Sequence, residues 1–184
     1  AYEIEFQFTL FPLHPNTPDE GLTLEQLFAG RNIDAEAMQT RMLGLMAEEG
    51  LPYGERTMTY NSRLAQELAK WADTQGGGVA IHDALYRAYF VDGLNIGLVD
   101  NLMAIVRKLS LPENEAREVL ASRRFGAAVH ADWRRCQTIG ITAVPTFAVG
   151  DDTAVGAQPY EVLELLVAEG GAAKRSIPRD NEDK

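Results

Sequence analysis

The chain has 184 residues, of which 46% are hydrophobic and 24% are charged, a balance typical of a soluble globular protein. No run of about 18 apolar residues occurs, so the sequence predicts no membrane-spanning helix. A net charge of −10 argues against nucleic acid or an anionic lipid surface as the main partner. Cys136 is the only cysteine, which excludes an internal disulfide and leads us to expect a cytoplasmic, reducing environment.

The first residues follow the pattern of a β-strand. Apolar and polar residues alternate from position 4 to position 10, which predicts a strand over residues 2–11 with one buried face. The apolar positions are Ile4, Phe6, Phe8 and Leu10. Three prolines and a glycine in PLHPNTPDEG then predict a loop. Because no initiator methionine precedes this strand, we expect that upstream residues are cleaved, disordered or otherwise absent.

A long helical block follows the loop. Helical spacing of apolar residues, capping residues and glycine stops predict helices over residues 35–49, 63–75, 79–93, 97–111, 112–122 and 124–140. Asp34 is the expected cap of the first helix, and Gly50 ends it. Either Asn61 or Ser62 is the expected cap of the second helix.

Strand patterns return near the C-terminus. The segments AVPTFAVG and TAVGA, joined by a turn at Asp151–Asp152, predict a β-hairpin, and PYEVLELLVAEGG predicts a closing helix. Three strands are too few for a sheet flanked by so many helices, so we expect a partner strand that this sequence lacks. The order of elements predicts an α/β core interrupted by an all-helical insertion.

Pro145 lies among the apolar residues of the first hairpin strand, where it cannot donate to a ladder. One interpretation is a trans proline at the start of an edge strand, since only about 5–6% of X–Pro bonds in folded proteins are cis. The other depends on the surroundings: a helix, the segment Val144–Pro145–Thr146, a hairpin and a last helix. That arrangement resembles the second half of a thioredoxin fold, in which a cis proline turns the preceding backbone outward.

More of the sequence carries this resemblance. Over roughly residues 4–168 the chain is similar to the DsbA-like family of the FrnE, 2-hydroxychromene-2-carboxylate isomerase and kappa glutathione transferase type. The motifs are FQFTLFPLHPNTPDEG, YNSRLAQELAKWADTQG, ALYRAYFVDGLNIGLVDNLMAIVRKLSL and GITAVPTFAVGDDTAVGAQPYEVLELL. Gln66 departs from the family pattern, because histidine is usual at that position.

The resemblance implies a thioredoxin-like sheet with a large helical insertion between its strands. The implied domains are an incomplete core (residues 1–21 and 127–171), an insertion (residues 22–126) and a flexible tail (residues 172–184). Family members carry Cys-x-x-Cys, or a serine or single cysteine in the isomerases and transferases, on a first strand and helix that are absent here. We therefore expect no catalytic residue within the chain and a Cys-x-x-Cys segment upstream of it.

The resemblance also implies binding residues. Val144, Pro145, Thr146 and Asn61 are the expected substrate-binding residues. Ala157 and Gln158 correspond to a region that holds the carboxylates of glutathione in some relatives. Asn61 has an alternative role as a helix cap.

Cys136 and the histidines offer no catalytic site of their own. Cys136 lies near the end of its helix, and we predict a buried structural thiol rather than a reactive one. His14, His82 and His130 are scattered without zinc-ligand spacing, so we predict no metal site.

The leading hypothesis is a thiol–disulfide oxidoreductase that acts on protein or small-molecule dithiols and disulfides. It needs no cofactor, although glutathione is a candidate ligand, and a homodimer is a candidate assembly. One alternative is a glutathione-dependent isomerase or transferase on the same fold. Another is a non-catalytic thioredoxin-fold protein that binds peptides.

Overall fold

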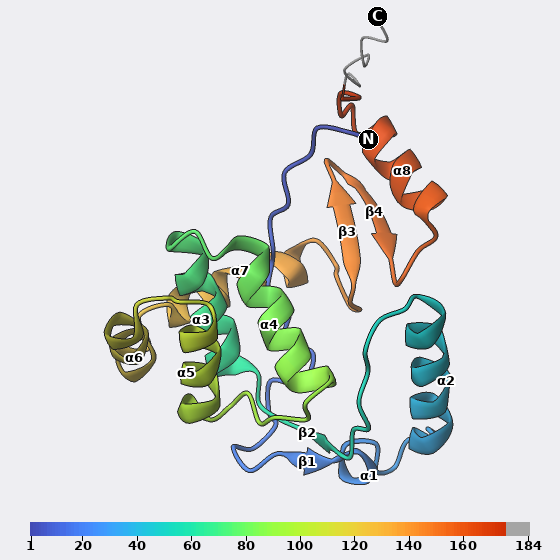
Figure 1. Ribbon diagram of the computed structural model, residues 1–184. Coiled ribbons are helices and arrows are strands. Elements are labelled where there is room, and N and C mark those ends of the chain that lie inside the picture. Colours follow the sequence, from blue (N-terminus) through green and yellow to red (C-terminus); the bar gives the residue numbers. More distant parts are fainter. Residues whose placement is uncertain (176–184) are drawn as a thin grey trace, which may run out of the picture. The chain divides into compact units, whose positions relative to one another are not determined.

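The structure is a computed structural model that describes residues 1–175 of the chain, and it divides into two compact units (Figure 1). Unit 1 comprises residues 1–13 and the described residues from Asp132 onward, and unit 2 comprises residues 14–131. In chain order the elements are β1 (Leu22–Thr23), α1 (Leu24–Leu27), α2 (Ala35–Glu48), β2 (Met58–Thr59), α3 (Arg63–Thr74), α4 (Gly78–Phe90), α5 (Val99–Lys108), α6 (Glu113–Ser122), α7 (Gly126–Thr138), β3 (Thr146–Val149), β4 (Asp152–Val155) and α8 (Tyr160–Glu169).

The predicted helical block is confirmed, and its caps explain the helix starts. Asp34 precedes α2, and its Oδ1 accepts a hydrogen bond from the Ala37 N–H at 2.9 Å, as expected of a capping residue. Ser62 stands at the cap position of α3, but its side chain makes no capping hydrogen bond. The Asn61 side chain instead accepts the Arg63 N–H at 2.9 Å. Ser62 therefore occupies the cap position, and Asn61 supplies the side-chain hydrogen bond at the start of α3.

Helices α3 to α6 form the apolar core of unit 2. Each turns a stripe of apolar side chains inward, and the fully buried ones include Leu68, Trp71, Ile81, Leu102 and Val106. Burying a leucine or isoleucine side chain stabilises a fold by about 1.5–3 kcal/mol, so this cluster dominates the stability of the unit. None of the helices among residues 1–175 is both long and apolar enough to cross a bilayer.

A small substructure at the start of unit 2 was not predicted from the sequence. Strands β1 and β2 pair antiparallel over two residues each, with Leu22 opposite Thr59. The turn before β1 requires Gly21, because its φ is +86° and an added Cβ would lie 2.6 Å from the Thr59 carbonyl oxygen. Thr23 and Gln26 then form a capping box at α1.

Helix α2 contributes nothing to this core. No residue of α2 is buried, and the exposed apolar side chains are Met38, Met42, Leu43 and Leu45. The helix therefore depends on its Asp34 cap and on its own backbone hydrogen bonds.

Unit 1 contains the predicted hairpin and closing helix. Strands β3 and β4 pair antiparallel, and α8 packs against both of them (Figure 1). The turn lies at Gly150–Asp151, one residue earlier than predicted, because Val149 pairs with Asp152. Gly150 has a φ of +62°, a left-handed conformation that glycine adopts without strain.

The strand predicted for residues 2–11 is wrong. Within the described part of the chain its ladder consists of one isolated bridge between Tyr2 and Lys174, and Ile4 and Phe6 are 44% and 67% exposed rather than buried. The alternating sequence fits a strand, but a strand forms only where a neighbouring backbone supplies hydrogen bonds. Residues 4–9 therefore join no ladder that the structure describes within residues 1–175.

The end of the chain also differs from the expected flexible tail over residues 172–184. The Ala173 carbonyl accepts the Glu3 N–H at 2.8 Å, and the Arg175 N–H donates to the Ala1 carbonyl at 2.9 Å. Residues 173–175 are thus paired with the start of the chain. The remainder of the predicted tail, residues 176–184, lies outside the described residues.

Replacing Leu68 by alanine should lower the free energy of unfolding by about 2–5 kcal/mol, because this α3 side chain is fully buried in the core of unit 2. Urea unfolding followed by circular dichroism measures this change. Leu45→Ala on α2 is the matched control and should shift the value by no more than about 0.5 kcal/mol. Equal losses in the two variants would contradict the assignment of the core.

Candidate functional site

The candidate binding segment of unit 1 is residues 143–146, which join α7 to β3 and are called the link below. The Val144–Pro145 peptide bond is cis, as the thioredoxin resemblance implies. Two hydrogen bonds fix the link: the Thr146 hydroxyl donates to the Ala143 carbonyl at 2.8 Å, and the Pro145 carbonyl accepts the Gly156 N–H at 2.7 Å. The link is therefore tied both to itself and to the end of β4.

Val144 is the residue of the link whose backbone is available to a binding partner. Its side chain is 47% exposed, and the following proline is exposed as well. Among residues 1–175, neither the N–H nor the carbonyl of Val144 has a hydrogen-bond partner. Such a residue, two positions before the start of β3, can pair with an added extended chain.

Ala157 and Gln158 lie beside the link, because Gly156 bonds to Pro145. Ala157 is exposed, whereas the Gln158 side-chain amide donates to the Val155 carbonyl at 2.6 Å. This bond closes the turn between β4 and α8. The structure thus brings five of the six predicted site residues together at one end of the hairpin. They are Val144, Pro145, Thr146, Ala157 and Gln158, of which Gln158 has a structural role there.

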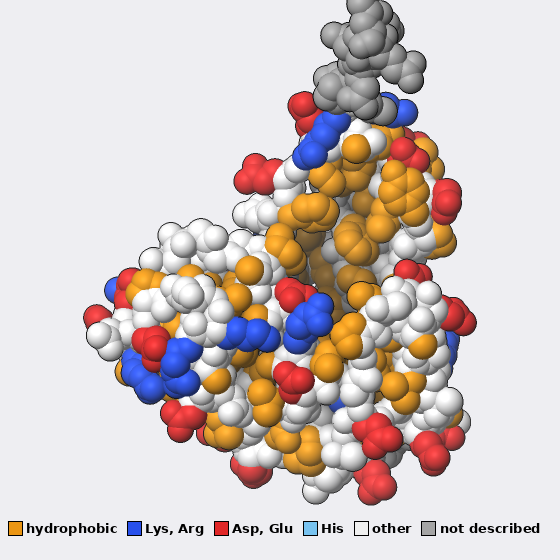
Figure 2. Space-filling view, in the orientation of Figure 1, with side chains coloured by type: hydrophobic (Ala, Val, Ile, Leu, Met, Phe, Trp, Pro, Cys, Tyr) orange, Lys and Arg blue, Asp and Glu red, His pale blue; other side chains and the backbone are white. Residues whose placement is uncertain are grey.

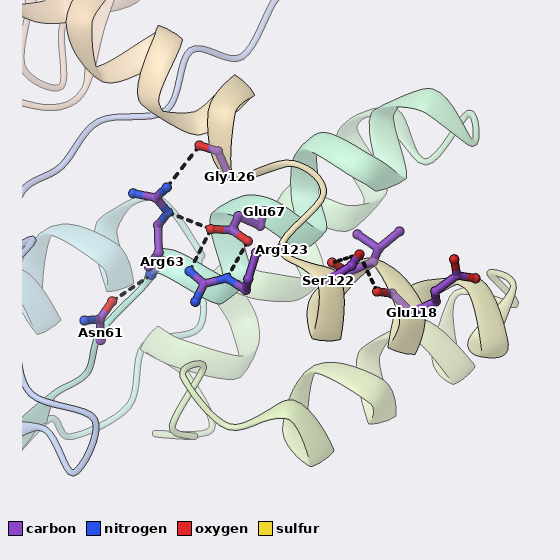
Figure 3. Close-up of polar contacts among 8 residues, drawn as sticks. Asn61, Arg63, Glu67, Glu118, Ser122, Arg123 and Gly126 are labelled. Carbon is purple, nitrogen blue, oxygen red and sulfur yellow. Dashed lines mark hydrogen bonds and ion pairs between the residues drawn. The ribbon is translucent and has the colours of Figure 1, made fainter.

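Asn61 lies in the other unit, and its side chain makes two hydrogen bonds within that unit. Its Oδ1 accepts the Arg63 N–H, as Figure 3 shows. Its Nδ2 donates to the Thr17 carbonyl at 2.7 Å. These bonds attach the start of α3 to the loop before β1. The capping alternative for Asn61 is therefore the role that the structure displays.

A buried ionic cluster around Glu67 was not predicted from the sequence. The Glu67 side chain is 0% exposed, and both of its oxygens accept hydrogen bonds from Arg123 at 2.8 Å (Figure 3). Arg63 donates to the same carboxylate at 2.7 Å and to the Gly126 carbonyl at 3.0 Å. The cluster therefore joins α3 to the end of α6 and the start of α7.

The charges of this cluster explain why the pKa of Glu67 is lowered. Burial alone would raise the pKa of Glu67, but the hydrogen bonds and charges of Arg123 and Arg63 outweigh it and hold the pKa below 4.5. The Arg63–Glu67 pair has the i, i+4 spacing that the sequence could have revealed. Arg123, in contrast, reaches Glu67 from 56 positions away, so only the fold brings it there.

Cys136 on α7 is buried, as predicted. It is 5% exposed, and its Sγ lies 3.8 Å from the Leu10 carbonyl. Burial, together with the charge of Asp132, raises the pKa of the thiol above its ordinary value of 9.0. Asp132 also accepts the Leu10 N–H at 2.8 Å, so both residues attach the N-terminal segment to α7. A thiol in this environment holds little thiolate at neutral pH.

The described histidines give no metal centre. His82 is buried, and its Nε2 lies 3.4 Å from a carboxylate oxygen of Asp73. Over residues 1–175 no group of three or more histidine, cysteine, aspartate or glutamate side chains is placed to hold a metal ion.

Comparisons with known proteins bear on the family of this chain. The family model described as the DSBA-like thioredoxin domain matches residues 1–168. The protein YwbO of Bacillus subtilis (strain 168) is 26% identical over 107 residues, which are 58% of this chain and 54% of YwbO. The chain thus spans about half the length of this curated relative.

One solved structure shows the same fold. It is titled a "putative protein disulfide isomerase" from Nitrosomonas europaea, and it superposes with a TM-score of 0.63. The two sequences are 16% identical, and the match covers 83% of this chain and 77% of that chain.

Replacing Glu67 by glutamine should lower the free energy of unfolding by about 2–4 kcal/mol at pH 7, because two arginines lose the charge that they face. Arg107→Gln, which removes the exposed Arg107–Glu113 pair, is the control and should cost no more than about 1 kcal/mol. Since the pKa of Glu67 is lowered in the folded state, the difference between wild type and Glu67→Gln should persist above pH 4.5. It should disappear as the pH falls through the folded-state pKa, and a pH-independent difference would contradict this account.

Native Cys136 should react with iodoacetamide at pH 7.5 at least about tenfold more slowly than in the urea-unfolded protein, because burial disfavours the thiolate. Mass spectrometry of the alkylated peptide measures both rates. Equal rates in the two states would show that the thiol is accessible in the fold.

Proposed function

We propose, from the premise that this chain belongs to the DSBA-like thioredoxin domain family, that the protein is a thiol–disulfide oxidoreductase acting on protein or small-molecule dithiols and disulfides. The observation that carries the proposal is the exposed link, in which the backbone of Val144 has no hydrogen-bond partner among residues 1–175. A substrate segment next to a disulfide can pair there as an added strand.

The cysteine within the chain does not supply the reacting thiol. Thiol–disulfide exchange needs an accessible thiolate, whereas Cys136 is buried and its pKa is raised. The reacting thiols are therefore assigned to a Cys-x-x-Cys segment outside residues 1–184. Their chemistry is a two-electron exchange. One thiolate attacks a substrate disulfide and releases a substrate thiolate, and the second thiolate then attacks the mixed disulfide and releases the other substrate sulfur.

Unit 1 offers a place for that segment. Ile4 and Phe6 are exposed, and among residues 1–175 β3 is paired only with β4. A two-stranded hairpin is marginally stable in isolation, so a further strand between these backbones would stabilise unit 1. Figure 2 shows the hydrophobic side chains that gather over the part of the molecule containing β3, β4 and α8. A strand with apolar residues would cover part of this surface.

The natural full-length protein should contain two redox-active cysteines besides Cys136 and should reduce a peptide disulfide with dithiothreitol as reductant. Differential alkylation with mass spectrometry locates the cysteines, and a fluorescence-quenched peptide disulfide measures turnover. A natural protein with no cysteine besides Cys136 would overturn the proposal. A single cysteine or serine at that position, together with glutathione binding by calorimetry, would favour the isomerase or transferase alternative. Absence of both activities would leave the peptide-binding alternative.

The link itself is tested by Val144→Arg. The new side chain places a bulky charge where the substrate backbone docks, so KM for the peptide disulfide should rise about tenfold while exchange with small disulfides is unchanged. Val162→Arg on α8 is the matched control, because Val162 is similarly exposed, at 40%, in the same unit. Equal effects of both variants would contradict docking at the link.

A further inference from the structure

Helix α2 of unit 2 presents a row of apolar side chains that its own unit leaves exposed. Met38, Met42 and Leu45 follow the spacing i, i+4, i+7, so they share one face of the helix and are called the α2 stripe below. Their exposed fractions are 41%, 39% and 45%. The apolar core of unit 2 contains no residue of α2. A stripe of this kind ordinarily packs on a neighbouring element.

The apolar surface continues beyond both ends of the helix. Ile33 before the helix and Leu51 after it are exposed as well. Gly50 has a φ of +66°, and its N–H donates to the Ala47 carbonyl at 3.1 Å. The Leu51 N–H then donates to the Met46 carbonyl at 2.8 Å, which completes a Schellman motif. These bonds hold Leu51 at the last turn of the helix, next to the α2 stripe.

A helix as short as α2 needs packing for its stability. It has 14 residues, and isolated helices of about 12–15 residues are marginal in water. Gly44 in its interior lowers the helix stability further, because glycine loses more conformational freedom on folding than other residues do. A partner that covers the α2 stripe would therefore stabilise the helix.

Acidic side chains lie at both ends of α2. Asp34 and Glu36 stand at its start and Glu48 and Glu49 at its end, whereas Arg41 is its one basic residue. Among residues 1–175 none of these four carboxylates forms an ion pair. The C-terminal end of a helix favours positive charge, yet the last turn of α2 holds no basic residue. The charge that complements α2 is therefore positive.

We propose that the α2 stripe docks a helix-forming polypeptide segment that carries apolar and basic side chains. Methionine is unbranched and adaptable, so Met38 and Met42 suit apolar side chains of varied shape. A second copy of α2 is a poor partner, because both ends of the helix are acidic and pairing in either direction sets like charges against each other. The stripe lies in unit 2 and involves no thiol, so the proposal is independent of the redox function.

Fluorescence anisotropy of dye-labelled synthetic peptides, titrated with the natural full-length protein, tests this proposal. The probe is a peptide of about 20 residues in which leucines recur at helical spacing and lysines fill the other positions. It should bind saturably at physiological salt. A peptide of the same composition with its leucines scrambled should bind at least about tenfold more weakly, because it forms no apolar face. Glutamate in place of lysine should also abolish saturable binding, because the charges then repel.

Met42→Glu separates the apolar contact from the attraction of charge. This variant should weaken binding of the leucine–lysine peptide by about tenfold or more, because a carboxylate would be buried beneath the peptide. Val79→Glu is the matched control, since Val79 on α4 is exposed in the same unit and gains the same charge. It should bind the peptide at least as tightly as wild type does. Replacing Glu48 and Glu49 together by glutamine should weaken binding by about threefold and reduce its salt dependence.

Three results would overturn the proposal. They are the absence of saturable binding, equal affinity for the scrambled peptide, and equal effects of Met42→Glu and Val79→Glu. Sedimentation equilibrium tests the second copy as occupant. A wild-type dimer that dissociates in Met42→Glu would assign the α2 stripe to self-association and would likewise overturn the proposal, whereas the same oligomeric state in both proteins agrees with it.

Discussion

The N–H and carbonyl groups of an extended backbone need hydrogen-bond partners. The structure of unit 1 depends on which of its extended segments find such partners. Its hairpin pairs fully along the edge between β3 and β4. The outer edge of β3 and the backbone of Val144 have no such ladder among the described residues. These unmet groups connect the fold to the proposed function, because a strand with the reacting cysteines and a substrate peptide would each satisfy some of them.

Unit 2 buries its apolar side chains and pairs its buried charge with its own residues. Its helices bury a continuous apolar core, and the buried Glu67 carboxylate is balanced by two arginines. Removing either kind of contact is expected to lower the stability of this unit. Arg56 of the same unit packs its guanidinium over the rings of Tyr89 and Phe90 and donates to the Tyr89 hydroxyl.

The sequence predicted the elements whose signals are local. Helix α2 followed from Asp34 and Gly50, and the hairpin followed from two short apolar runs around a turn. The strand predicted over residues 2–11 is wrong, because an alternating pattern shows which side chains would share a face. It does not show whether another backbone lies alongside to pair with the segment. The link at Val144 was predicted from a resemblance, whereas Arg123 and Arg56 were not, since their contacts join residues far apart in sequence. The role of Asn61 was left open between substrate binding and helix capping. Its side chain also bonds to the Thr17 carbonyl, a contact between residues far apart in the sequence.

Amide hydrogen exchange on the natural full-length protein tests the central claim most directly, since it reports on individual backbone N–H groups. The account predicts that residues 4–9 are protected by a strand from outside residues 1–184. It also predicts that the Val144 amide exchanges rapidly in the free protein and becomes protected when a disulfide-containing peptide binds. A Val144 amide that is protected without the peptide, or unchanged by it, would contradict the account.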